Sequence, residues 1–118
     1  TKLVLSCSKP EPTAQSLDER CRELIAQQPL MLFIKGTPEE PRCGFTVQLL
    51  GLLQKEGIRR FGTFNILADE IVRQHLKTMS QWPTYPQIYW RGELLGGLDI
   101  LKEMAESGQL GDIKRECA

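Results

Sequence analysis

The sequence has little of what zinc proteins, secreted proteins and nucleic-acid-binding proteins usually contain. It holds one histidine, His75, and its four cysteines stand far apart, with no pair separated by two residues. A zinc site built by this chain alone is therefore not expected, and neither is the disulfide framework of a small secreted protein. Fifteen basic and fifteen acidic residues give a formal net charge of zero. No global field therefore draws in nucleic acid or an anionic membrane.

Long apolar runs are also missing, because none approaches the roughly 20 residues that a membrane helix needs, and no signal peptide is visible. The sequence begins at Thr1 without a methionine, which indicates an excised domain or a processed product. Its 118 residues, 41% of them hydrophobic, suffice for one domain with a real core. We expect a flexible lead-in over residues 1–13 and one domain over residues 14–118. The unpaired cysteines favour a reducing compartment.

Cys43 stands between a predicted strand and a predicted helix. The apolar run 30–34 predicts a buried strand, and the leucine spacing in residues 44–56 predicts a helix. The first N–H groups of a helix are unpaired and its dipole is positive there, so the thiolate is favoured over the thiol. Lys35 and Arg42 add positive charge nearby. These features predict a nucleophile or a soft-metal ligand; the alternative is a buried, inert cysteine.

The rest of the chain predicts helices and strands in alternation. We expect a helix capped by Ser16 with Glu19 and ending before Pro29, a strand over residues 61–66, a helix over 69–79, a hairpin of 87–90 and 93–96, a helix over 98–106 and a last helical turn over 109–116. A strand–helix–strand unit followed by a hairpin predicts an α/β fold. Its centre is a four-stranded mixed sheet flanked by helices on both faces.

The other cysteines and one pair of bases have plainer expected roles. Cys21 falls on the apolar stripe of the first helix and is predicted to pack in the core. Cys7 and Cys117 lie near the termini and are expected to be exposed. Arg73 and Lys77 are four residues apart and share one helix face, which by itself indicates a solvated face.

Four motifs, in this order, resemble the thioredoxin fold and, within it, the monothiol glutaredoxins marked by Cys-Gly-Phe-Ser. They are Phe33-Ile34-Lys35-Gly36, Cys43-Gly44-Phe45-Thr46, Trp82-Pro83-Thr84-Tyr85-Pro86-Gln87 and Gly96-Gly97-Leu98-Asp99. The resemblance covers residues 16–112. It is greater to the glutaredoxin domains of the multidomain thioredoxin–glutaredoxin proteins than to the single-domain mitochondrial members. It implies a cytoplasmic location, with the nucleus as a further site and the mitochondrion as the alternative.

The resemblance also implies a role for each motif residue. Cys43 is implied to be the active thiol and an iron–sulfur ligand. Lys35, Arg73 and Lys77 are implied to bind a carboxylate of glutathione. Phe45 and the main chain of Thr84 and Tyr85, before a cis Pro86, are implied to line its middle. Gly97, Leu98 and Asp99 are implied to bind its γ-glutamyl end. Glutathione carries two carboxylates and an ammonium, so it needs cations, an acid and a helix N-terminus, which these residues supply.

Two positions depart from the family pattern. Thr46 stands where serine is usual, and because both side chains are hydroxyls that can bond a thiolate, we expect function to survive. Leu98 stands where some members carry a second cysteine, so no nearby thiol is expected to resolve a disulfide of Cys43.

Two functions of different classes follow. The first is glutathione-dependent binding and transfer of a [2Fe–2S] cluster. A cluster needs four ligands, so Cys43 from each protomer and two glutathione thiolates predict a cluster-bridged homodimer. The second is a glutathione-dependent thiol–disulfide oxidoreductase acting through Cys43. The loop 37–41 resembles the insertion of the cluster-binding group and favours the first. A third reading is a pure interaction module.

The expected partners follow from the first of these functions. They are a second copy of the chain, apo-proteins that receive the cluster and, by resemblance, a BolA-type protein. Neither nucleic acid nor a membrane is expected as a partner.

Overall fold

The computed structural model describes residues 14–118, and a four-stranded sheet in the order β2-β1-β3-β4 forms their centre. Its strands are β1 (Leu30–Ile34), β2 (Gly62–Asn65), β3 (Gln87–Trp90) and β4 (Glu93–Gly96). β1 and β2 run parallel, with Leu32 opposite Thr63, whereas β1 and β3 run antiparallel, with Leu32 opposite Ile88. β4 returns antiparallel to β3 after a turn in which Arg91 and Gly92 have positive φ. The predicted mixed sheet is confirmed.

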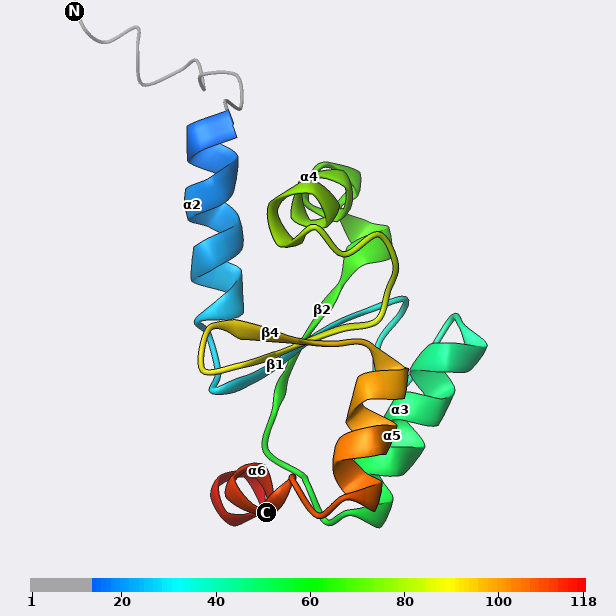
Figure 1. The fold of residues 1–118 in the computed structure, drawn as a ribbon. Coiled ribbons are helices and arrows are strands. Elements are labelled where there is room, and N and C mark those ends of the chain that lie inside the picture. Colours follow the sequence, from blue (N-terminus) through cyan, green and yellow to red (C-terminus); the bar gives the residue numbers. More distant parts are fainter. Residues whose placement is uncertain (1–13) are drawn as a thin grey trace, which may run out of the picture.

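Helices cover both faces of this sheet, as the α/β prediction requires. They are α2 (Ala14–Ile25), α3 (Gly44–Lys55), α4 (Glu70–Ser80), α5 (Leu98–Glu106) and α6 (Gly111–Cys117), with a short 3₁₀ turn η1 (Ile66–Ala68) after β2. Figure 1 shows α2 and α4 on one side of the sheet and α3, α5 and α6 on the other. None of the helices in residues 14–118 is long and apolar enough to cross a membrane.

Strand β1 lies between two separate hydrophobic clusters, because its side chains alternate between the faces. Leu30, Leu32 and Ile34 pack with α3, α5 and α6. Met31 and Phe33 pack with α2 and α4. All five side chains are fully buried, so the connection from β1 to α3 leaves from the most constrained strand of the sheet.

Helix α4 starts at a well-defined point that is tied to α2. Asp69 caps it, since its carboxylate accepts a hydrogen bond from the Val72 N–H at 3.1 Å. The same carboxylate pairs with Arg20 of α2 at 2.8 Å. This cap fixes which way the face that carries Arg73 and Lys77 points.

The N-terminal boundary of α2 differs from the prediction. The helix already includes Ala14, so Ser16 lies inside it and is not its N-cap. Alanine and glutamine are good helix formers, so the helix extends past the serine that the capping pattern indicated. Cys21 is fully buried on this helix, as expected, whereas the expectation for Cys7 falls outside residues 14–118.

The prediction of an exposed Cys117 is wrong. Its side chain is 2% exposed and packs with Ile113 and Ile58. Its carbonyl oxygen accepts hydrogen bonds from the main-chain N–H groups of Arg59 and Arg60, at 2.6 and 2.8 Å. These contacts dock the last helix against the segment that leads into β2, so proximity to the chain end did not leave this residue exposed.

Candidate functional site

Cys43 is the N-cap residue of α3, with extended backbone at φ −151° and ψ 141°, and its side chain is partly exposed. Partial desolvation raises the pKa of the thiol. The N–H groups of Thr46 and Phe45, the charge of Lys35 and the Thr46 hydroxyl together lower it by more. The net pKa is therefore below the ordinary value, because the start of the helix and one base stabilise the thiolate. The sequence predicted this thiolate-stabilising position.

Of the two bases expected to assist the thiol, only Lys35 does so. Arg42 is exposed and pairs with Glu40 at 3.2 Å. Its main-chain N–H donates to the Lys35 carbonyl at 2.9 Å, which closes the loop between β1 and α3. Arg42 therefore helps to shape the loop.

Thr46 is fully buried beneath the thiol and joins the end of β1 to the first turn of α3. Its hydroxyl oxygen accepts a hydrogen bond from the Lys35 N–H at 3.3 Å. The hydroxyl proton is then free to point to the sulfur, which agrees with the lowered pKa of Cys43. The threonine that departs from the family pattern is thus accommodated, with its hydroxyl directed into the site.

Replacing Thr46 with valine is expected to raise the pKa of Cys43, because valine has the same shape but no hydroxyl to stabilise the thiolate. The measurement is the rate of alkylation of Cys43 by iodoacetamide as a function of pH, since only the thiolate reacts. In the wild type the midpoint should lie below that of an unperturbed cysteine, because the pKa of Cys43 is lowered. It should move up in Thr46→Val and stay in place in the matched control Thr46→Ser. An unchanged midpoint in Thr46→Val would show that the hydroxyl does not act on the sulfur.

A cationic cavity of about 190 Å³ lies beside the first turn of α3. It is lined by Lys35, Phe45, Arg73, Lys77, Pro83, Thr84 and Tyr85. Arg73 and Lys77 therefore do not merely form a solvated face, because the cap of α4 turns both toward the end of β1. The three bases can hold a carboxylate at this end.

Arg73 is held in place on two sides. Its guanidinium bonds the Glu70 carboxylate at 3.2 Å, and its main-chain carbonyl accepts a hydrogen bond from the Tyr85 hydroxyl at 2.8 Å. Burial raises the pKa of Tyr85, so this phenol stays protonated as the donor. The Nε atom of Arg73 is buried and has no partner among residues 14–118.

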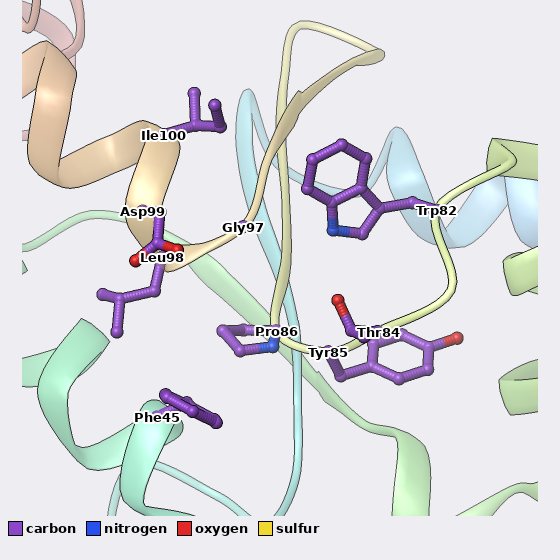
Figure 2. A pocket seen from close by; sticks show the side chains of 9 residues that line it. All are labelled: Phe45, Trp82, Thr84, Tyr85, Pro86, Gly97, Leu98, Asp99 and Ile100. Atoms are coloured by element: carbon purple, nitrogen blue, oxygen red, sulfur yellow. The ribbon is translucent and has the colours of Figure 1, made fainter.

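A second cavity of about 420 Å³ adjoins the first and shares Phe45, Thr84 and Tyr85 with it. Figure 2 shows its walls: Phe45 from α3, Leu98, Asp99 and Ile100 from the start of α5, and the loop segment Trp82, Thr84, Tyr85 and Pro86. Asp99 lies in the first turn of α5, whose N-cap is Gly97. The two cavities form one cleft, with bases at one end and a carboxylate with a helix N-terminus at the other.

All the residues predicted to bind glutathione line this cleft. Cys43 stands two residues before one of them, Phe45. The Tyr85–Pro86 bond is cis, as the family resemblance implies. Trp82, Pro83 and Ile100 also line the cleft but are not among the predicted site residues, although Trp82 and Pro83 stand in one of the four motifs.

Gln87 was also missed as a residue that supports the site. It is fully buried, and its amide donates to the Trp82 carbonyl at 2.9 Å and accepts from the Tyr89 hydroxyl at 2.9 Å. A glutamine at the start of an apolar strand was the available signal, because a buried amide needs partners. It holds the loop 82–84 against the sheet.

The other two cysteines of residues 14–118 differ from Cys43. Burial raises the pKa of both Cys21 and Cys117, and both side chains are buried, whereas that of Cys43 is partly exposed. Within the same residues, no three His, Cys, Asp or Glu side chains come together as a metal site. A metal centre at Cys43 therefore requires ligands from outside this part of the chain.

Comparison with known proteins agrees with this geometry. The glutaredoxin family model matches residues 30–95. The chain is 54% identical over 96 residues to Glutaredoxin 3 of Danio rerio, covering 81% of this chain and 29% of that protein. It is 50% identical over 104 residues to Monothiol glutaredoxin-4 of Schizosaccharomyces pombe, covering 88% and 42%. The chain thus spans less than half the length of either relative.

A solved structure supports the same assignment. The solution structure of reduced poplar apo GrxS14 is 36% identical and superposes with a TM-score of 0.70, over 87% of this chain and 94% of that one. The cysteine at the start of α3, the cleft beside it and the family match lead to one conclusion. This chain belongs to the glutaredoxin family and resembles its monothiol members.

Proposed function

We propose that this chain binds glutathione in the cleft and, as a homodimer, holds a [2Fe–2S] cluster for transfer to other proteins. One observation carries the proposal. Among residues 14–118, Cys43 is the one thiol that is both accessible and of lowered pKa, and it stands at the edge of a cleft charged at both ends. Such a thiolate is a ligand for soft metals.

The ligand requirement of the cluster gives the stoichiometry. A [2Fe–2S] cluster takes four ligands, normally thiolates. One Cys43 from each of two protomers supplies two, and one glutathione in each cleft supplies the other two. A small thiol as half of the ligand set exchanges with solution, which suits transfer better than storage.

The charges of the cleft complement those of glutathione. Lys35, Arg73 and Lys77 receive the glycine carboxylate at one end. Asp99 and the first turn of α5 receive the ammonium and carboxylate of the γ-glutamyl group at the other. The middle of the tripeptide then lies along Thr84 and Tyr85, with its thiol directed toward Cys43.

The surface around Cys43 supports a second copy of the chain as the partner. Phe45 and Val47, in the first turn of α3, are 58% and 52% exposed. Apolar side chains beside a ligand that two chains share gain from being covered by the second chain. A BolA-type partner, apo-protein recipients and a cytoplasmic or nuclear location are part of the same proposal.

The lowered pKa of Cys43 favours a second candidate function, a glutathione-dependent oxidoreductase. The Cys43 thiolate would attack the glutathione sulfur of a glutathionylated protein and release the protein thiolate. A second glutathione thiolate would then attack the mixed disulfide, giving glutathione disulfide and regenerating Cys43. No other thiol of the chain is needed.

Anaerobic reconstitution with iron and sulfide tests the proposed function, in parallel samples with glutathione, with S-methylglutathione or with neither. With glutathione we expect visible absorption, elution as a dimer and one cluster per two chains. S-methylglutathione fits the same cleft but cannot ligate iron, so that sample should stay colourless and monomeric. A coloured dimer without glutathione would contradict the ligand set. A colourless monomer that deglutathionylates a test protein would support the second candidate.

A further inference from the structure

Gln87 is fully buried at the start of β3, where it stands opposite Phe33 of the central strand β1. From there its side-chain amide reaches back to the loop that precedes the strand. The Nε2 group donates to the Trp82 carbonyl at 2.9 Å and, over a longer 3.4 Å, to the Thr84 carbonyl. A carbonyl oxygen only accepts hydrogen bonds, so the amide must turn its nitrogen to the loop. Gln87 therefore ties one wall of the cleft to the sheet.

A closed ring of hydrogen bonds fixes this orientation of the amide. The Tyr89 hydroxyl donates to the Gln87 Oε1 atom at 2.9 Å. Burial raises the pKa of Tyr89 to about 12, so the phenol keeps its proton and acts as the donor. The Ser80 side chain hydrogen-bonds the same phenol and accepts from the Trp82 main-chain N–H at 3.2 Å. Because each member donates to the next, the four residues strengthen one another's bonds and hold the loop in one place.

The bond to Thr84 determines which way the next N–H group points. The peptide unit that joins Thr84 to Tyr85 is trans, so its C=O and N–H groups point in opposite directions. The carbonyl points inward to Gln87, so the Tyr85 N–H points outward, on the side where Thr84 and Tyr85 line both cavities of the cleft. The peptide unit after Trp82 offers no N–H, because Pro83 follows it. One donor, the Tyr85 N–H, is thus aimed at the cleft.

The place of this donor indicates which part of the ligand it meets. Bases line one end of the cleft, and Asp99 with the first turn of α5 lines the other. Thr84 and Tyr85 line both cavities and so lie between the two ends; Figure 2 shows them opposite Leu98 and Asp99. A main-chain N–H in this middle position suits a neutral acceptor, which in a tripeptide is a peptide carbonyl.

We propose that Gln87 is a positioning residue for glutathione, which acts by aiming the Tyr85 N–H at a peptide carbonyl in the middle of the tripeptide. This inference rests on the glutathione binding proposed above and adds to it a side chain that does not touch the ligand. Gln87 works from beneath, because it is fully buried and its amide is engaged by groups of the protein. Its effect should fall on ligand affinity and leave the Cys43 thiolate unchanged, since that thiolate is stabilised by the first turn of α3 and by Lys35.

Calorimetric titration with S-methylglutathione tests the inference, with each variant compared with the wild type at pH 5 and at pH 8. Gln87→Met has a similar volume but no donor, so it is expected to bind about tenfold more weakly than the wild type at both pH values. Gln87→Glu presents a carboxylate to the two carbonyl oxygens at the higher pH and should show a similar loss there. At pH 5 the new carboxyl, whose pKa burial raises, is protonated and can donate to the Trp82 carbonyl. Most of the affinity should then return.

Gln109→Glu, the same substitution at an exposed position beyond the end of α5, is the matched control and should bind as the wild type does at either pH. The iodoacetamide midpoint of Cys43 should stay at its wild-type value in both Gln87 variants, and circular dichroism should show both to be folded.

A Gln87→Met variant that binds as tightly as the wild type would overturn the inference and leave the proposed function standing. So would a folded Gln87→Glu that binds no more tightly than Gln87→Met at pH 5, since the loss would then come from packing and not from a missing donor. A wild type that does not bind S-methylglutathione would refute both the inference and the proposed function.

Discussion

Replacing Cys43 with serine is expected to abolish cluster binding completely. Serine keeps the size of the side chain and can cap α3, but its hydroxyl does not ionise near neutral pH. Each protomer would then lose its one contribution to the proposed ligand set, and glutathione alone would have to hold the cluster. Under the reconstitution conditions above, Cys43→Ser should stay colourless and elute as a monomer. Deglutathionylation of a test protein should be lost as well.

The control for this result is Cys21→Ala, which removes a thiol that is fully buried between α2 and the sheet. This variant should be less stable than the wild type, since it leaves a small cavity in the core. It should nonetheless form the coloured dimer. A chromophore that survives in Cys43→Ser, or that disappears in a folded Cys21→Ala, would contradict the assignment of Cys43 as the ligand. Thermal unfolding of both variants separates lost ligation from lost folding.

Replacing Gly36 with alanine is expected to destabilise the protein by about 2–5 kcal/mol, from strain at positive φ and from overpacking. Gly36 has φ +97°, and a Cβ atom there would lie 2.4 Å from the Glu40 carbonyl oxygen and 2.7 Å from the Arg42 nitrogen. Its N–H also donates to the Asn65 side chain at 2.9 Å. The residue closes the loop between Lys35 and Cys43, so relief of the clash would displace both.

The measurement is thermal unfolding followed by circular dichroism, where we expect the melting temperature to fall by about 8 °C or more. Iodoacetamide reactivity of Cys43 at neutral pH should also decline. Two glycines provide matched controls, since neither has an atom within 4 Å of a built Cβ. Gly57→Ala, at φ +76°, carries only backbone strain. Gly51→Ala, within α3, should stabilise by about 0.5–1 kcal/mol. If Gly36→Ala behaved like Gly57→Ala, the loop would be more adaptable than its contacts indicate.

Much of the fold could be predicted because the hydrophobic period is strong in this chain. Three local patterns each predict one kind of element that agrees with the elements beside it. They are the fully apolar run of β1, the helical leucine spacing after Cys43 and the Arg91-Gly92 turn. Cys43 could be singled out for the same reason, since its place between strand and helix is a local property. The family resemblance then supplied the residues predicted to bind glutathione, and the structure brings them into one cleft.

What the sequence missed depends on contacts between distant segments. Arg73 and Lys77 share a face in any helix, but only the cap at Asp69 and its pairing with Arg20 determine where that face points. The burial of Cys117 comes from main-chain bonds to residues nearly half the chain away. The burial of the Trp82 Nε1 atom, which has no partner among residues 14–118, likewise depends on segments that are brought together only in the fold.

The two-sided core places the thiol of the site and two of its bases in different layers of the protein. The thiol belongs to α3, which packs with α5 and α6, whereas Arg73 and Lys77 belong to α4, which packs with α2 on the opposite face. A repacking of the α2–α4 layer can shift the bases and change how tightly the tripeptide is held, while the nucleophile keeps its surroundings. Substitutions on the other layer act on the sulfur and on the second end of the cleft together, because Phe45 lies on α3 and Asp99 on α5. Selection, or an engineer, can thus adjust affinity at the α4 end of the cleft while reactivity stays unchanged, whereas a change at Lys35 affects both.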